Sequence, residues 1–390
     1  MTNRYSLSAV FCFLLLTAVF SDAYAATGAQ PVTHRIIVKF KAGPTPSAAR
    51  DKRHGQILRL GNNLPLRHLR TLGDLSSVYS LGRFQKLDEV KAVAAELMRR
   101  DDVEYVEPDL RRYPQFVPND ADYSNQWYLH ETAGGINAEP AWDITFGNSS
   151  VVIALIDSGI LPHNDLVRVL PGYDFIAEDP PPEPDLYFTA NDGDGRDEDP
   201  SDPGDAVPED RCDPAGSPAE NSTWHGTKLA GIVAAETNNN SGLAGIDQQA
   251  WVLPVRALGR CGGYLSDIAD AIRWAAGLSV PGVPDNPTPA DVINLSLGAA
   301  GVCSHTEQQA IDAAVANGTV VVVAAGNEGG FISDSAPANC ENVITVTATT
   351  RQGAETCYTN IGTGADLAAP GGNSQEDFCT AFPDDQIYML

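Results

Sequence analysis

Apolar residues from about residue 114 onwards gather in short continuous runs separated by longer mixed stretches. Runs rich in β-branched residues are typical of buried parallel strands, and they cover residues 151–156, 291–296, 319–325 and 343–347. Helical stretches lie between or beside them, at residues 225–236, 266–278 and 306–317. The alternation predicts an α/β fold with a doubly wound, mostly parallel sheet. A site is expected outside the carboxyl ends of the strands.

Residues 26–113 carry a different pattern. Residues 34–41 and 103–106 alternate as strands, and residues 88–99 place apolar side chains at the spacing of an amphipathic helix. A small α+β domain is therefore predicted for residues 26–113, ahead of a larger domain at residues 114–390.

The first 25 residues predict a secretory signal peptide. Arg4 precedes an apolar run at residues 9–20, and Ala23-Tyr-Ala25 is a small-x-small cleavage site. The run is shorter than the roughly 20 residues that span a bilayer. We expect an exported protein with no membrane span.

Charge divides the chain at the same boundary. Residues 26–113 hold 16 Lys+Arg and 10 Asp+Glu, a net of +6, and residues 114–390 hold 8 and 40, a net of −32. An acidic protein of this kind is not expected to bind nucleic acid or anionic membranes. The opposite charges predict that the two domains dock.

An acidic insertion at residues 178–220 has no periodicity and is expected to be a surface loop. Within it, carboxylates and glycines crowd together over residues 191–202. Oxygen ligands at this density suit Ca²⁺, although an acidic run is usually a solvated surface. The candidate ligands are Asp192, Asp194, Asp197 and Asp202.

Three polar residues lie where a site is expected. His225 opens a helix of small and aliphatic residues, for which Asn221, Ser222 or Thr223 is the expected cap. A histidine so placed is suited to act as a base. Asp157 ends the first apolar strand, where a desolvated carboxylate needs a partner. Asn327 follows another strand among glycines and can donate a hydrogen bond into a cleft.

Four ordered motifs resemble the subtilisin-like serine proteases, from about residue 126 to 370. They are Ile-Asp-Ser-Gly-Ile at 156–160, His-Gly-Thr-x-x-Ala-Gly at 225–231, Ile-Asn-Leu-Ser-Leu-Gly at 293–298 and Ala-Ala-Gly-Asn-Glu-Gly at 324–329. The resemblance implies that His225 is the base, that Asp157 orients it, and that Asn327 donates to the oxyanion. Polypeptides would be the substrates, paired with backbone of the protein. The implied substrate-binding residues are Gly262, Gly263, Tyr264, Ser296, Leu297, Gly298 and Gly326.

The resemblance implies further features. Residues 26–113, ending in Val-Glu-Tyr-Val-Glu-Pro-Asp109, resemble an inhibitory propeptide that blocks the cleft of its own enzyme. Asp165 matches a family calcium ligand. Six cysteines remain after the signal peptide, and composition alone leaves 15 pairings open. The family implies Cys212–Cys261 and Cys303–Cys340, with Cys357 and Cys379 left over.

Two departures from the family pattern stand out. Lys228 replaces a usual histidine, which affects local packing. The nucleophile segment Gly-Thr-Ser-Met-Ala-x-Pro does not occur in the 390 residues, and Ser374 lies in a Gly-rich loop with no helix after it. We expect a truncated, inactive fragment of a secreted serine endopeptidase. The alternative is a non-catalytic binding or inhibitory protein with the same fold.

Overall fold

The computed structural model describes residues 32–41, 58–59, 65–111, 116–179, 185–212, 217–373 and 386–390. The chain forms two compact units, Met1–Gln115 and Phe116–Leu390. The predicted signal peptide, Ser374 and Cys379 lie outside the described residues. No described helix has the length and apolar composition that a membrane crossing requires.

The first unit contains a five-stranded sheet with the order β2-β3-β4-β1-β5. Its elements are β1 (Val32–Phe40), β2 (Leu58–Arg59), β3 (Pro65–Thr71), β4 (Ser77–Lys86), α3 (Leu87–Leu97) and β5 (Val103–Pro108). The helix buries Val90, Ala94 and Leu97, which pack with Ile36, Val38 and Tyr79 of the sheet. The two strands and the helix expected here are present, and β2, β3 and β4 complete the sheet.

The second unit is built on a seven-stranded sheet of order β14-β13-β11-β9-β6-β8-β7 in which every pairing is parallel. The strands are β6 (Val152–Asp157), β7 (Tyr173–Asp174), β8 (Trp251–Arg256), β9 (Val292–Leu295), β11 (Val320–Ala324), β13 (Ile344–Thr349) and β14 (Leu367–Pro370). A small ribbon joins β10 (Ala299–Ala300) to β12 (Ser335–Ala336).

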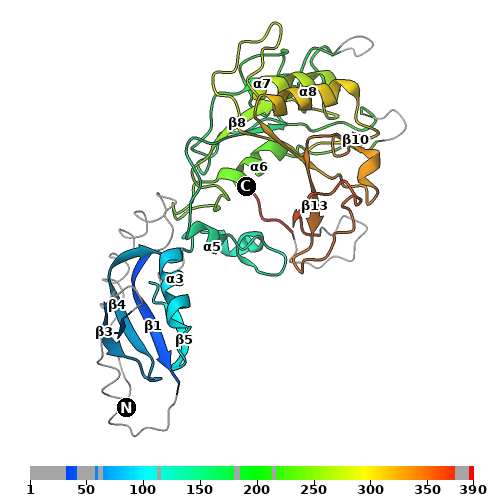
Figure 1. The fold of residues 1–390 in the computed structure, drawn as a ribbon. Coiled ribbons are helices and arrows are strands. Elements are labelled where there is room, and N and C mark those ends of the chain that lie inside the picture. Colours follow the sequence, from blue (N-terminus) through cyan, green and yellow to red (C-terminus); the bar gives the residue numbers. More distant parts are fainter. Residues whose placement is uncertain are drawn as a thin grey trace, which may run out of the picture. The chain divides into compact units, whose positions relative to one another are not determined.

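Helices cover both faces of this sheet (Figure 1). The helices are α4 (Trp127–His130), α5 (Ala138–Trp142), α6 (His225–Ala234), α7 (Leu265–Ala275) and α8 (His305–Ala316), with short 3₁₀ turns at Tyr123–Asn125 and Ile332–Asp334. Ala154 and Ile156 of β6 face α7 and α8 in the main core. Leu155 faces the opposite way and packs with α6. Since alternate residues of one strand serve both helical layers, the predicted doubly wound fold is confirmed.

Strand β8 is not among the strands predicted from the sequence, and it contains Pro254. Proline cannot donate a ladder hydrogen bond and normally disfavours an interior strand. Here Pro254 is opposite Leu155 of β6, whereas β7 pairs only with Val255 and Arg256. On that far side, Val169 bridges to Val252 ahead of the proline, so the pairing is interrupted at Pro254 and resumes beyond it.

The acidic insertion is irregular, as its composition predicted, but it does not lie wholly at the surface. Its described residues form no helix or named strand, in agreement with the missing periodicity. However, Phe188, Ala190 and Val207 are buried, and so are Asp179 and Asp202. The insertion is a packed part of the second unit.

Candidate active site

Asp157 and His225 meet at the carboxyl end of the sheet. Asp157 is the last residue of β6 and His225 the first of α6, 68 positions later. The His225 Nδ1 lies 2.9 Å from both carboxylate oxygens of Asp157. Because a carboxylate only accepts, Nδ1 carries the proton and Nε2 is the free acceptor of the neutral ring. Among the described residues, no other side chain hydrogen-bonds this ring.

Burial of the two side chains differs sharply. The Asp157 side chain is 1 % exposed and that of His225 is 44 % exposed. Asp157 also accepts a hydrogen bond of 2.7 Å from the backbone N–H of Ser158. The hydrogen bond to Asp157 raises the pKa of His225 above its ordinary value, with partial opposition from burial. The pair has the arrangement of a base held in one tautomer by a buried carboxylate.

Gly226 allows this close approach. A Cβ at position 226 would lie 2.1 Å from the backbone oxygen of Gly159 and 3.3 Å from Asp157 Oδ1. Any side chain there would push α6 away from the end of β6. The glycine after the histidine is therefore required by packing, independently of its flexibility.

The start of α6 is capped differently from the expectation. The N-cap position belongs to Trp224, which has φ of 52° and makes no side-chain cap bond. The predicted caps at residues 221–223 lie one to three positions too early. Instead the hydroxyl of Ser158 accepts the hydrogen bond of the Gly226 N–H, at 3.0 Å. Ser158, which follows β6, thus accepts from one of the backbone N–H groups at the start of α6 that have no partner within the helix.

The remaining predicted site residues follow neighbouring strands. β8 and β9 are the two partners of β6, and β11 pairs with β9. Because parallel strands end at one edge of the sheet, the segments with Gly262, Ser296 and Asn327 emerge at the same edge as Asp157. The Asn327 side chain is exposed there.

The predicted substrate-binding segments have distinct backbones. Gly262 has φ of 90° and bridges to Gly259, and the following Tyr264 is 54 % exposed. Leu297 packs against the main core, and Gly298 is followed by the exposed strand β10. Gly326 has φ of 101°, and a Cβ there would lie 2.4 Å from Asn360 Nδ2. Their role in binding substrate stays a prediction.

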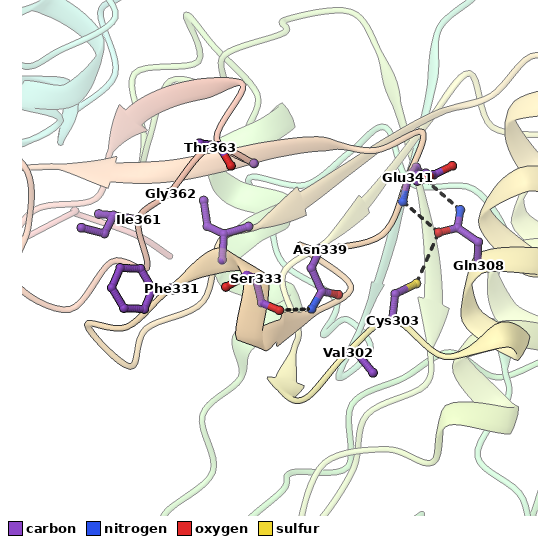
Figure 2. A pocket seen from close by; sticks show the side chains of 12 residues that line it. Val302, Cys303, Gln308, Phe331, Ser333, Asn339, Glu341, Ile361, Gly362 and Thr363 are labelled. Carbon is purple, nitrogen blue, oxygen red and sulfur yellow. Dashed lines mark hydrogen bonds between the residues drawn. The ribbon is translucent and has the colours of Figure 1, made fainter.

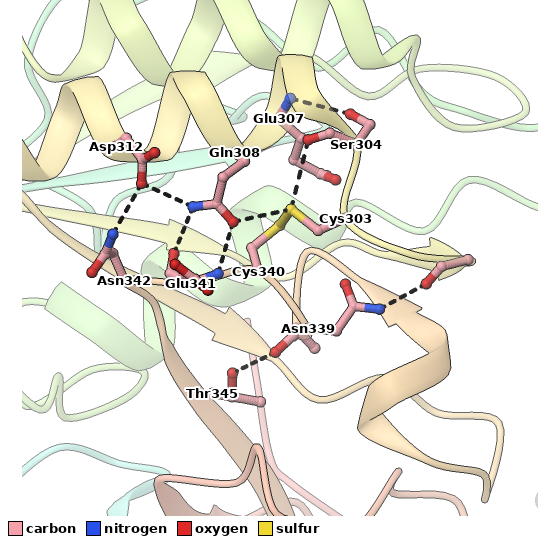
Figure 3. The surroundings of a disulfide bond; sticks show 12 residues. Cys303, Ser304, Glu307, Gln308, Asp312, Asn339, Cys340, Glu341, Asn342 and Thr345 are labelled. Carbon is pink, nitrogen blue, oxygen red and sulfur yellow. Dashed lines mark hydrogen bonds between the residues drawn. A yellow bond between two sulfur atoms is a disulfide. The ribbon is translucent and has the colours of Figure 1, made fainter.

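Both disulfides implied by the family resemblance are confirmed. Cys212 is bonded to Cys261, which ties the insertion to the segment after β8. Cys303 is bonded to Cys340 beside the start of α8 (Figure 3). Ser304 caps this helix by accepting from the Glu307 N–H. The bond therefore joins a helix start to the segment that precedes β13.

Neither the four predicted calcium ligands of the insertion nor the separately predicted Asp165 belongs to a described group of three acidic side chains with ligand atoms close enough for a metal. Asp192 pairs with the guanidinium of Arg256, and Asp202 accepts from Ser158 and from the Gly204 N–H. Asp165 accepts from Asn239 Nδ2 at 2.6 Å and from the Leu243 N–H at 2.8 Å. Asp197 accepts from the Asp199 N–H, and Asp194 is exposed. Four of the five carboxylates face hydrogen-bond donors and Asp194 is exposed, so as arranged they do not fit a shared cation, and calcium stays a prediction.

Within the described residues, only one group of three His, Cys, Asp or Glu side chains has ligand atoms close enough for a metal. It consists of Cys303, Glu307 and Cys340. Its two cysteines are joined in the disulfide and have no thiolate to offer.

A pocket of about 970 Å³ has a lining that includes neither His225 nor Asp157; Figure 2 shows the side chains that line it. Exposed Val302 and Phe331 lie on it, together with Asn339 and residues 361–364. Apart from the disulfide cysteine Cys303, it contains none of the predicted site residues.

Sequence reasoning missed two groups next to the pair. Ser158 stands beside Asp157 in the Ile-Asp-Ser-Gly motif, so its position could have been noticed. Arg256 is a lone arginine in an apolar run, and a buried charge requires a partner. It is 1 % exposed and is paired with Asp174 and Asp192. Burial raises the pKa of Asp174 to about 7, although Arg256 lowers it.

Comparison with known proteins agrees with this geometry. The subtilase family model, peptidase S8, matches residues 148–389. An extracellular protease of Xanthomonas campestris is 45 % identical over 376 residues, covering 93 % of this chain and 63 % of that protein. An extracellular basic protease of Dichelobacter nodosus is 40 % identical over 350 residues, covering 87 % and 56 %.

The chain thus spans about three fifths of the length of these curated relatives. A solved structure of a protease from Pseudoalteromonas arctica is 49 % identical, with a TM-score of 0.62, and the match covers 66 % of this chain and 74 % of that one. The family match covers more than half of this chain and includes Asp157, His225 and Asn327. The chain belongs to the subtilase family of serine peptidases.

Proposed function

We propose that this protein is a secreted serine endopeptidase in which His225 is the general base and Asp157 its orienting carboxylate. The observation that carries the proposal is the 2.9 Å contact between His225 Nδ1 and a carboxylate that is itself buried. A base so held accepts the hydroxyl proton at Nε2 and returns it to the leaving amine. Asn327 would donate to the oxyanion that forms on the substrate carbonyl.

Secretion is supported by the predicted signal peptide and by the two relatives named as extracellular proteases. Polypeptide substrates follow from the family. A substrate strand would lie along residues 262–264 and 296–298, whose segments leave the sheet on either side of β6. Pairing with backbone on both sides holds the scissile bond in one register.

The nucleophile is the part that this sequence does not supply. The 390 residues contain no Gly-Thr-Ser-Met-Ala segment, and no described serine hydroxyl hydrogen-bonds the His225 ring. We propose that the chain as given does not hydrolyse peptide bonds. In subtilisin, removing the catalytic serine alone lowers the turnover number by a factor of about 10⁶.

We also propose that residues 26–113 are the propeptide of this enzyme. Support comes from their separate core and from their positive charge beside an acidic partner of net −32. Added to an active relative at micromolar concentration, the segment should inhibit it. A lack of inhibition would remove this part of the proposal.

The central test expresses residues 26–390 and assays a chromogenic peptide. No turnover and no processing near Tyr113 are expected. A second preparation extends the chain with the coding sequence that follows Leu390, if this encodes a Gly-Thr-Ser segment. Turnover in the extended protein that disappears in His225→Ala supports the proposal. An extended protein without any turnover would favour the non-catalytic alternative, a binding or inhibitory protein of the same fold.

A further inference from the structure

Residues 222–226 span the start of α6. They are held by a short segment of the acidic insertion, residues 202–206, which is called the clamp below. Its first contacts are made by Asp205, whose carboxylate accepts from Thr223 N at 2.6 Å and from Thr223 Oγ1 at 2.7 Å. The Ala206 N–H donates to Ser222 Oγ at 3.1 Å. Two of the three residues before His225 are therefore fixed from the insertion.

Gly204 is the residue of the clamp that lies next to the Trp224 ring. It has φ of 91°, and a Cβ there would lie 2.6 Å from Ser222 Oγ and 3.2 Å from the Trp224 ring. Trp224 itself has φ of 52°, a conformation that residues other than glycine hold only when their surroundings impose it. Gly204 of the clamp lies against the Trp224 ring and so helps to hold this backbone conformation. Because His225 follows directly, the conformation of Trp224 also sets where the His225 backbone begins.

Asp202 extends the clamp to the helix itself. It is 3 % exposed, and its Oδ2 accepts from Ser158 Oγ at 2.8 Å. Since an ionised carboxylate cannot donate, the Ser158 proton points to Asp202 and a lone pair is left for the Gly226 N–H. The clamp thus sets the acceptor that caps α6 directly after His225.

The clamp is anchored on its other side. Asn191 Nδ2 donates to the Gly204 carbonyl at 2.7 Å, and Arg260 Nε donates to the Ala206 carbonyl at 2.9 Å. Arg260 precedes Cys261 of the disulfide to Cys212. The clamp is therefore hydrogen-bonded to residues 222 and 223 on one side and to Asn191 and Arg260 on the other.

We propose that Asp202 and Asp205 are positioning residues for His225: the clamp holds the imidazole in register with Asp157. This inference rests on the proposed role of His225 as the base, and it assigns to the acidic insertion a task beyond stability. The observation that carries it is that residues 222, 223, 224 and 226 each contact the clamp or the Ser158 hydroxyl that it orients.

The experiment titrates His225 by NMR in the full 390-residue chain with isotope-labelled histidine. Assignment uses the signal lost in His225→Gln. Two readouts are followed, the pKa of His225 and the low-field proton resonance of its Nδ1–H bonded to Asp157. Neither readout requires catalytic turnover.

Pairs of substitutions at each aspartate distinguish the loss of the hydrogen-bond acceptor from the loss of the negative charge. Asp205→Ala and Asp202→Ala remove the acceptors, whereas Asp205→Asn and Asp202→Asn keep an oxygen acceptor without the charge. We expect the alanine variants to lose the low-field resonance and to bind the His225 proton about tenfold more weakly, one pKa unit. The asparagine variants should keep the resonance. Glu209→Gln, an exposed acid of the same insertion outside the clamp, should change neither readout.

Each other outcome has a definite meaning. If the alanine variants only lower the melting temperature while the His225 readouts stay as in the parent, the clamp is structural and the inference fails. The same holds if asparagine and alanine act alike, because charge alone would then explain the effect. Should Asp202→Ala not fold, the partly exposed Asp205 carries the test. Asp157→Asn is the separate control: if it leaves the pKa of His225 unchanged, the proposed base pair itself is wrong.

Discussion

The sheet of the second unit and the acidic insertion are held in place by different interactions. In the sheet, residues such as Ile156, Leu253 and Ile293 are fully buried among apolar neighbours, and the backbone is satisfied by the parallel ladder. The insertion has no ladder. It is joined to β8 by the pair of Asp192 with Arg256, and to α7 by the pairs of Arg196 with Asp267 and Asp270. Arg256 also pairs with Asp174 of β7.

The difference concerns how stability responds to a single change. Apolar burial is spread over many contacts, so trimming one side chain removes a small part of it. A buried ion pair concentrates its effect in two groups, and removing one leaves the other charged and unpaired. We therefore expect the insertion to depend on a few residues and the sheet to tolerate equivalent changes.

The largest effect is expected for Arg256→Met. It leaves Asp174 buried without its cation and should lower the free energy of unfolding by about 3–5 kcal/mol, measured by urea denaturation. Arg273→Met is the matched control, since Arg273 lies on α7 and forms none of the ion pairs that the described structure records. Equal effects of the two substitutions would contradict the comparison.

A smaller loss is expected when the insertion is released covalently. The double substitution Cys212→Ser and Cys261→Ser opens a link across 49 residues and should cost about 2–4 kcal/mol. Limited proteolysis should then begin within residues 185–220 before the sheet is cut. Cleavage that begins elsewhere would show that the disulfide does not secure the insertion.

A change of one methylene in the sheet should cost less again. Ile293→Val, at a residue with 0 % exposure, is expected to lower the free energy of unfolding by about 0.5–1.5 kcal/mol. Thermal unfolding should remain cooperative. A loss as large as that of Arg256→Met would mean that both regions are equally sensitive.

The smallest effect is expected from a chelator. Four of the five predicted calcium ligands face N–H donors, a hydroxyl or a guanidinium. Excess chelator should therefore shift the melting temperature by less than the roughly 2–4 °C that corresponds to 1 kcal/mol in a domain of this size. Calorimetry with and without chelator measures this. A larger fall would support the calcium predicted from the acidic run.

Much of the fold followed from local pattern. Buried strands such as β6, β9 and β11 were predictable because parallel strands covered on both faces read as continuous apolar runs. Asp157, His225 and Asn327 were predictable as candidates because each stands at the end of such a run or at the start of a buried helix. The two confirmed disulfides followed from the family resemblance, whereas spacing alone left 15 pairings open.

What the tertiary structure decided was which distant groups meet. Asp157 and His225 are 68 residues apart, and no local rule gives their separation. Ser158 caps α6 from the end of β6, and β8 runs through Pro254 where the pairing on one of its sides is interrupted. Asp192 and Asp202 of the insertion pair with Arg256 and Ser158. Apolar residues set the fold, and the fold brings distant segments close together. Buried polar groups find their partners only where such segments meet, so these partners leave no periodic pattern in the sequence.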